Sequence, residues 1–187
     1  MTPRSIATLL AAVIDQKSFD KIKGYITRAQ SAADAQVLCG GECDDSQGFF
    51  IRPTIIETQN HQYESMIEEI FGPVLTVYVY KDQDFEETLR ICDQSSKYAL
   101  TGAIFAKERG VIQSMTEALT NSAGNFYIND KPTGAVVGQQ PFGGGLKSGT
   151  NDKAGSMMNL QRWVSMRTIK ETFVSPKEHG YPYQQET

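Results

Sequence analysis

Residues 134–153 have the composition of a main chain that approaches a small ligand closely. The stretch holds six glycines in twenty residues, too many for a helix or a strand. It also holds few apolar side chains that would pack it as a plain connector. Glycine frees the backbone to come near a ligand, and the N–H groups of such a loop can bind an anion or a carbonyl oxygen. This loop is therefore the first candidate for a binding site.

A second candidate is the segment 68–74, where two carboxylates precede an aromatic residue and a Gly-Pro turn. The turn at Gly72 and Pro73 ends a helix abruptly, so Glu69 and Phe71 stand at the beginning of the next strand. A fixed carboxylate accepts hydrogen bonds from two neighbouring hydroxyls, and an aromatic ring packs on a flat heterocycle. The alternative is an ordinary helix end on the surface, followed by a turn.

The 187-residue chain has the composition of a globular domain, with 40% hydrophobic and 21% charged residues. Its net charge of −4 gives no electrostatic reason to expect nucleic acid or an anionic membrane as a partner. No apolar run approaches the roughly 20 residues that span a bilayer. We expect a small-molecule ligand, with no nucleic acid and no membrane. The sequence holds no glycine fingerprint for a dinucleotide or a P-loop, so a coenzyme would need surfaces supplied from elsewhere.

The cysteines indicate neither a disulfide framework nor a metal site. Cys39, Cys43 and Cys92 are the three cysteines, and the histidines, His61 and His179, have no regular spacing from them. A structural zinc site needs four ligands, which this set does not supply. We expect reduced, structural thiols, with Cys92 on the core face of a helix, and no bound metal.

Helical and strand patterns alternate along the chain. Apolar residues recur at helical spacing after Ser18, a residue type common at helix N-caps: Phe19, Ile22, Ile26 and Ala29. Pro53 favours a sheet edge or a bulge for the strand that contains it. The order predicts an α/β fold, a largely parallel sheet flanked by helices in one structural unit. We expect strands at 37–39, 49–57, 75–80, 100–105 and 125–128, and helices around 85–92, 111–119 and 157–163.

The segment Glu69-Ile70-Phe71-Gly72-Pro73 resembles a signature of the NAD(P)-dependent aldehyde dehydrogenases. The strings at 98–102, 142–144 and 147–149 also resemble this family, and the resemblance runs from about residue 12 to 172. It implies that this chain is the later part of an aldehyde dehydrogenase catalytic domain, with NAD as the cofactor. By the same resemblance, Glu69 holds the nicotinamide ribose hydroxyls and Phe71 packs near the nicotinamide.

Three longer strings, at 125–131, 137–144 and 148–153, resemble the branch of the family that oxidises L-glutamate γ-semialdehyde to L-glutamate in proline catabolism. The resemblance implies that backbone N–H groups at Gly134 and Ala135 bind the α-carboxylate of the substrate. It also implies that Phe142 packs along the aliphatic chain of the substrate. The alternative is that these glycines only satisfy turns and that Phe142 belongs to the core.

The family's catalytic cysteine belongs to a Gly-Gln-Lys-Cys-Ser-like string, which this sequence does not contain. We therefore expect a C-terminal portion of the enzyme without catalytic residues, inactive alone because the nucleophile and coenzyme domain are absent. Residues 1–10 are expected to fall outside the family. We expect residues 1–174 to form the partial catalytic domain and 175–187 a poorly ordered tail.

Two other functions remain open, and both start from the family resemblance. The strand expected at 166–173 resembles one that takes part in oligomer contacts in the family. The first alternative is therefore that this chain is a non-catalytic interaction module. The resemblance also implies that the complete enzyme is a homo-oligomer. The other alternative is a different aldehyde dehydrogenase with another substrate. The resemblance places the protein in the mitochondrial matrix of a eukaryote, or in the cytoplasm of a bacterium.

Overall fold

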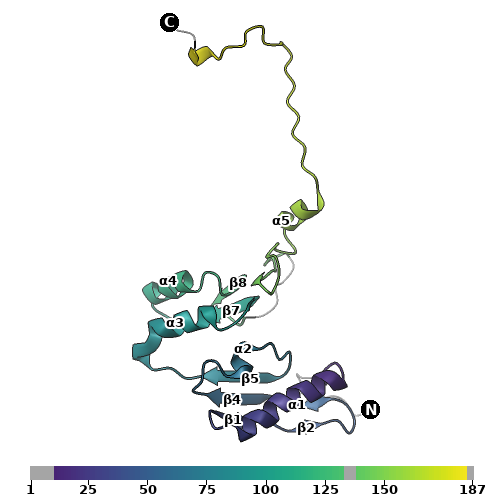
Figure 1. The fold of residues 1–187 in the computed structure, drawn as a ribbon, viewed down its shortest axis with the longest axis vertical. Coiled ribbons are helices and arrows are strands. Elements are labelled where there is room, and N and C mark those ends of the chain that lie inside the picture. The colour runs from purple at the N-terminus through teal and green to yellow at the C-terminus, as the bar shows by residue number, and fades with distance from the viewer. Residues whose placement is uncertain (1–10, 133–137, 185–187) are drawn as a thin grey trace.

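The computed structural model describes residues 11–132 and 138–184. Two units, each built on a small sheet, follow one another along the chain, and an extended segment leads away from them (Figure 1). Each unit has its own hydrophobic core. The expected α/β class is confirmed.

The first unit is a three-stranded sheet in the order β1-β4-β5, with helix α1 (Gln16–Ser31) packed on it. Strand β4 (Thr54–Thr58) is central, antiparallel to β1 (Ala35–Cys39) and parallel to β5 (Val74–Tyr78). The expected helical periodicity of α1 is confirmed, because Phe19, Ile22, Ile26 and Ala29 are its buried residues.

The expected cap of α1 is wrong. Asp15 is the N-cap, and its side chain accepts a hydrogen bond of 2.7 Å from the backbone N–H of Ser18. The helix thus begins two residues before Ser18, which lies in its first turn. Both aspartate and serine are good caps, so the residue type alone did not separate them.

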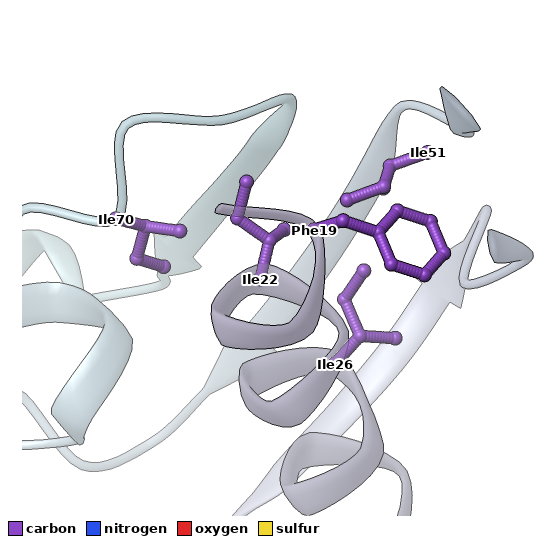
Figure 2. Packing of buried hydrophobic residues seen from close by; sticks show 5 residues of the cluster. All are labelled: Phe19, Ile22, Ile26, Ile51 and Ile70. Carbon is purple, nitrogen blue, oxygen red and sulfur yellow. The ribbon is translucent and has the colours of Figure 1, made fainter. Parts of the chain in front are cut away.

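The core of the first unit forms where α1 meets the segments around it. Phe19, Ile22 and Ile26 of α1 are almost completely buried, and Ile51 and Ile70 pack with them (Figure 2). Ile70 comes from the segment between α2 (Glu64–Ile67) and β5. The core therefore fixes a residue of the candidate segment 68–74.

The strand expected at 49–57 is divided in two. Strand β3 (Phe50–Ile51) pairs with β2 (Cys43–Asp44), and β4 begins after Arg52 and Pro53. Pro53 was expected in an edge strand or at a bulge, but it lies in neither strand, and β4 is at the centre of its sheet. Pro53 precedes the strand, so its missing N–H removes no ladder hydrogen bond.

The second unit places helices α3 (Phe85–Gln94) and α4 (Arg109–Ala118) against the parallel pair β7 (Thr101–Ile104) and β8 (Asn125–Ile128). Its core contains Leu89, Ile104, Ile112 and Leu119. The short strand β6 (Tyr98–Ala99) pairs with β9 (Gly145–Leu146), and a 3-10 turn at Asp82–Asp84 precedes α3.

The expected single, largely parallel sheet is only partly present. Among the described residues, β4–β5 and β7–β8 are parallel, whereas β1–β4, β2–β3 and β6–β9 are antiparallel. No strand of residues 11–132 or 138–184 joins the two units into one sheet.

The C-terminal part is exposed. Helix α5 (Met157–Leu160) and the 3-10 turn Gln161–Trp163 occupy the expected helical segment, but none of their residues is buried. The expected strand at 166–173 is absent from this part of the described chain, which runs extended and exposed to the 3-10 turn Pro182–Gln184. None of the helices formed by residues 11–132 and 138–184 has the length and apolarity to cross a membrane.

Candidate functional site

The segment between α2 and β5 alternates exposed and buried side chains. Ile70 is buried in the core, while its neighbours Glu69 and Phe71 are exposed, Phe71 to 87%. Phe71 has a φ of 61°, in the left-handed region that a bulky residue seldom occupies. An aromatic ring held in solvent by an uncommon backbone conformation points to a functional role.

Gly72 allows this segment to lie against α1. A Cβ at position 72 would come within 2.5 Å of the Cδ1 atom of Ile22, which is fully buried. The next residue, Pro73, accepts a hydrogen bond of 2.9 Å through its carbonyl oxygen from the N–H of Thr54. The core and strand β4 therefore hold the segment on both sides of the exposed ring.

Two lysines that the sequence did not single out also fix this segment. Lys21 of α1 donates a hydrogen bond of 2.9 Å from Nζ to the carbonyl oxygen of Glu69. Lys97 contacts both carboxylate oxygens of Glu68, at 3.2 and 3.3 Å, and this hydrogen bond and ion pair raise the pKa of Lys97. Within the described chain the carboxylate of Glu69 has no hydrogen-bond or ion-pair partner, so it is available to a ligand.

Phe142 lies on the glycine-rich loop of the second unit and is half-buried. Its N–H and carbonyl oxygen both pair with Ala154, at 2.8 and 2.7 Å. A cavity of about 310 Å³ is lined by Phe142, Leu100, Lys153 and the residues around them. Gly134 and Ala135, the expected carboxylate site, lie outside the described residues.

Close packing on β6 holds the loop in place. A Cβ at Gly144 would come within 2.7 Å of the Cα atom of Leu100 and 2.8 Å of the carbonyl oxygen of Ala99. The hydroxyl of Ser148 accepts a hydrogen bond of 3.0 Å from the N–H of Ala99. At least one glycine of the loop, Gly144, is thus required by close packing.

The two candidate segments lie on different units. Glu69 and Phe71 belong to the first unit and Phe142 to the second. The Glu68–Lys97 ion pair links the units next to both segments, because Lys97 also accepts a hydrogen bond of 3.0 Å through its carbonyl oxygen from the N–H of Lys147. This link was not predicted, since Lys97 does not stand out in the sequence and lies 29 positions from Glu68.

The thiols of Cys43 and Cys92 show no sign of activation. Desolvation raises the pKa of the Cys43 thiol and of the Cys92 thiol, whereas a nucleophilic thiol needs a lowered pKa. Cys92 is exposed rather than facing the core, so that expectation is wrong. The described residues contain no cluster of three or more His, Cys, Asp or Glu placed to bind a metal ion.

Known proteins match this chain over most of its length. The Δ1-pyrroline-5-carboxylate dehydrogenase of Dictyostelium discoideum, named as mitochondrial, is 59% identical over 177 residues, which is 95% of this chain and 32% of that protein. The crystal structure of the Mycobacterium tuberculosis Δ-pyrroline-5-carboxylate dehydrogenase is 52% identical, with a TM-score of 0.78, covering 93% of this chain and 32% of that one. The same enzyme bound with NAD is 51% identical, with a TM-score of 0.76, covering 92% and 31%.

A statistical model described as "Aldehyde dehydrogenase family" matches residues 1–169. The match begins at residue 1, so the expectation that residues 1–10 fall outside the family is wrong. The chain spans about a third of the length of the relatives that it matches. It belongs to the aldehyde dehydrogenase family.

Proposed function

We propose that this chain is the C-terminal, substrate-side part of an NAD-dependent dehydrogenase. That enzyme oxidises L-glutamate γ-semialdehyde, formed from Δ1-pyrroline-5-carboxylate, to L-glutamate in proline catabolism. The relatives named above carry this activity in their names and are about three times as long as the matched part. The observation that carries the proposal is the segment 69–71, where a buried isoleucine holds a free carboxylate and a ring in solvent.

NAD fits the groups on this segment. The carboxylate of Glu69 is free to accept hydrogen bonds from the two ribose hydroxyls of the nicotinamide nucleotide. The exposed ring of Phe71 gives an apolar surface for the nicotinamide. When bound, NAD accepts the hydride that the oxidation of an aldehyde releases. Lys21 and Ile70 hold these two groups in place through the main chain and the core.

The substrate side of the proposal rests on the glycine-rich loop. Amides at Gly134 and Ala135 bind the α-carboxylate, and Phe142 packs along the aliphatic chain. The fixed backbone on either side of Phe142 supports a constant place for its ring. The cavity beside Phe142 has room for a small molecule.

The surface of the chain supports its place in a larger protein. Its accessible surface is 14755 Å², whereas a compact monomer of this length exposes about 8,900 Å². Large apolar side chains are exposed on both units, among them Leu75, Phe105 and Leu146. Such faces are normally covered by more protein.

We infer that the isolated chain has no dehydrogenase activity. Neither Cys43 nor Cys92 has the lowered pKa of a nucleophile, and the glycine motifs of a coenzyme domain are absent from the sequence. Purified protein assayed with L-glutamate γ-semialdehyde and NAD checks this inference. Measurable turnover would refute it.

A second candidate function is a non-catalytic interaction module. We propose residues 1–174 as the partial catalytic domain, with 166–173 as an oligomerisation strand and 175–187 as a tail. Ile169 and Phe173 are 72% and 89% exposed, so this segment is free to pair with another subunit. In a homo-oligomer of the complete enzyme, the same strand would contact another subunit. We place this enzyme in the mitochondrial matrix of a eukaryote or in the cytoplasm of a bacterium.

A chimera tests the main proposal. This chain replaces the matched third of the Mycobacterium tuberculosis enzyme, to which it is 52% identical. We expect NADH to form with L-glutamate γ-semialdehyde, and Glu69→Gln to raise the KM for NAD about tenfold or more, because a hydrogen bond to a charged group is lost. Lys147→Met, at an exposed residue of the glycine-rich loop, is the control. A folded chimera in which Glu69→Gln leaves the KM for NAD unchanged would contradict the role of Glu69.

A further inference from the structure

Lys153 is a half-buried cation bound to oxygen atoms of the main chain and of one amide. Its Nζ donates to the carbonyl oxygen of Gly124, lies 3.3 Å from the carbonyl oxygen of Gly143, and lies 3.5 Å from Oδ1 of Asn125. An ammonium has three N–H donors, and here three acceptors surround it. Lys153 therefore has no donor left over for a substrate carboxylate.

Asn125, the first residue of β8, completes the contact between strand and loop. Its Oδ1 accepts a hydrogen bond of 3.1 Å from the N–H of Gly143. Its Nδ2 donates one of 3.0 Å to the carbonyl oxygen of Pro141. The strand and the loop also touch directly, because a Cβ at Gly124 would lie 2.0 Å from the carbonyl oxygen of Gly143.

These bonds fix the backbone of Phe142 from both sides. Asn125 binds the carbonyl before Phe142 and the N–H after it. Ala154 binds both main-chain groups of Phe142 itself, and Lys153 binds the carbonyl of Gly143. The φ and ψ angles of Phe142 are thus set by partners at every neighbouring peptide group, and with them the point from which its ring extends.

We propose that Lys153, together with Asn125, is a positioning residue for the ring of Phe142. The cation holds the glycine-rich loop against the beginning of β8, so the ring forms a wall at a constant place beside the aliphatic chain of an acidic aldehyde. This role in binding rests on the proposed function of Phe142. The proposal also assigns a structural role to the segment 148–153, whose last residue is Lys153.

Amide hydrogen exchange in the full 187-residue chain tests the positioning. Lys153→Met removes the charge and the donors but keeps most of the length, and Lys147→Met is the matched control on the exposed side of the same loop. We expect Lys153→Met to speed exchange at the amides of Phe142, Gly143 and Ala154 about tenfold or more. Lys147→Met leaves these amides unchanged, and Lys153→Arg, which keeps a cation with donors, restores much of the protection.

Three results would overturn the positioning role. The first is unchanged exchange at these amides in Lys153→Met. The second is equal acceleration throughout β7 and β8, which would show that Lys153 holds the whole unit. The third is no protection of these amides in the unaltered chain.

The chimera described above separates this inference from the proposed function. There, Lys153→Met is expected to raise the KM for L-glutamate γ-semialdehyde about tenfold, with kcat nearly unchanged. Faster exchange combined with an unchanged KM would show that Lys153 holds the loop in position but that Phe142 does not contact the substrate. This result would refute the proposed role of Phe142. An inactive chimera that still shows the exchange result would refute the proposed function and leave the positioning intact.

Discussion

Phe19 and Phe71 show how differently one residue type is used in this chain. Phe19 is fully buried in the first core, whereas Phe71 is 87% exposed at a φ of 61°. The sequence predicted the helix face of Phe19 from helical spacing, and the place of Phe71 before a strand from the Gly-Pro turn beside a carboxylate. The binding role of Phe71 stays a prediction. Local signals were sufficient for these two positions, because each signal lies within a short stretch of the chain, 19–29 for Phe19 and 69–73 for Phe71.

These two phenylalanines give a prediction for stability. Phe19→Ala is expected to lower the free energy of unfolding of the first unit by about 3–5 kcal/mol, because it leaves a cavity in a packed core. Phe71→Ala is expected to change it by less than about 0.5 kcal/mol. Urea unfolding followed by circular dichroism measures both. A large loss in Phe71→Ala would assign Phe71 to the core and remove it from the site.

The need for glycine at position 124 was not predicted from the sequence. It arises because the carbonyl oxygen of Gly143, 19 positions away, leaves no room for a Cβ atom. We expect Gly124→Ala to open the contact between β8 and the glycine-rich loop and to destabilise the second unit by about 2 kcal/mol or more. Gly110→Ala is the control, since a Cβ there meets no atom within 4 Å and alanine favours the helix α4. Thermal unfolding of the two variants tests this contrast, and equal melting temperatures would contradict it.

At the scale of elements, hydrophobic periodicity predicted the presence of helices and strands more accurately than it predicted their ends. The buried face of α1 and the strand 125–128 were predicted correctly. The cap of α1 and the division of 49–57 were not, because both depend on where hydrogen bonds begin rather than on hydrophobic spacing. Strand partners also escaped prediction, since pairing is a non-local choice.

The cap provides a test at this scale. Asp15→Ala is expected to lower the melting temperature of the first unit by more than Ser18→Ala does, because the backbone N–H of Ser18 donates the 2.7 Å bond and remains in the alanine variant. The same bond lowers the pKa of Asp15 below its ordinary value of 3.8. Its stabilisation is therefore present above pH 3.8 and lost at lower pH, as the carboxyl takes up a proton in the folded chain. A difference between the variants that persists when Asp15 is protonated would contradict the capping role.

At the scale of the whole molecule, the chain is two small units rather than the single parallel sheet expected from the order of elements. The Glu68–Lys97 pair that links them is exposed, and such pairs contribute little to stability. The family resemblance supplied the candidate residues Glu69, Phe71 and Phe142, and their roles stay predictions. It did not predict that Glu69 and Phe71 lie on one unit and Phe142 on the other, because this arrangement depends on long-range contacts.

Separate cores predict separate unfolding. Ile22→Ala, in the first core, is expected to speed amide exchange in β1, β4 and β5 while β7 and β8 keep their protection. Hydrogen exchange followed by mass spectrometry of peptides from each unit measures this difference. Simultaneous loss of protection in both units would show that they fold as one body.

The substrate preference of the chimera tests the central claim most directly. The measurement is kcat/KM for L-glutamate γ-semialdehyde against kcat/KM for 4-aminobutanal, which lacks only the α-carboxylate. If this chain supplies the loop that binds the carboxylate and the ring that holds the aliphatic chain, the first value exceeds the second by tenfold or more, and Phe142→Ala lowers activity toward the acidic aldehyde. Equal values for the two aldehydes in a folded, NAD-dependent chimera would contradict the account.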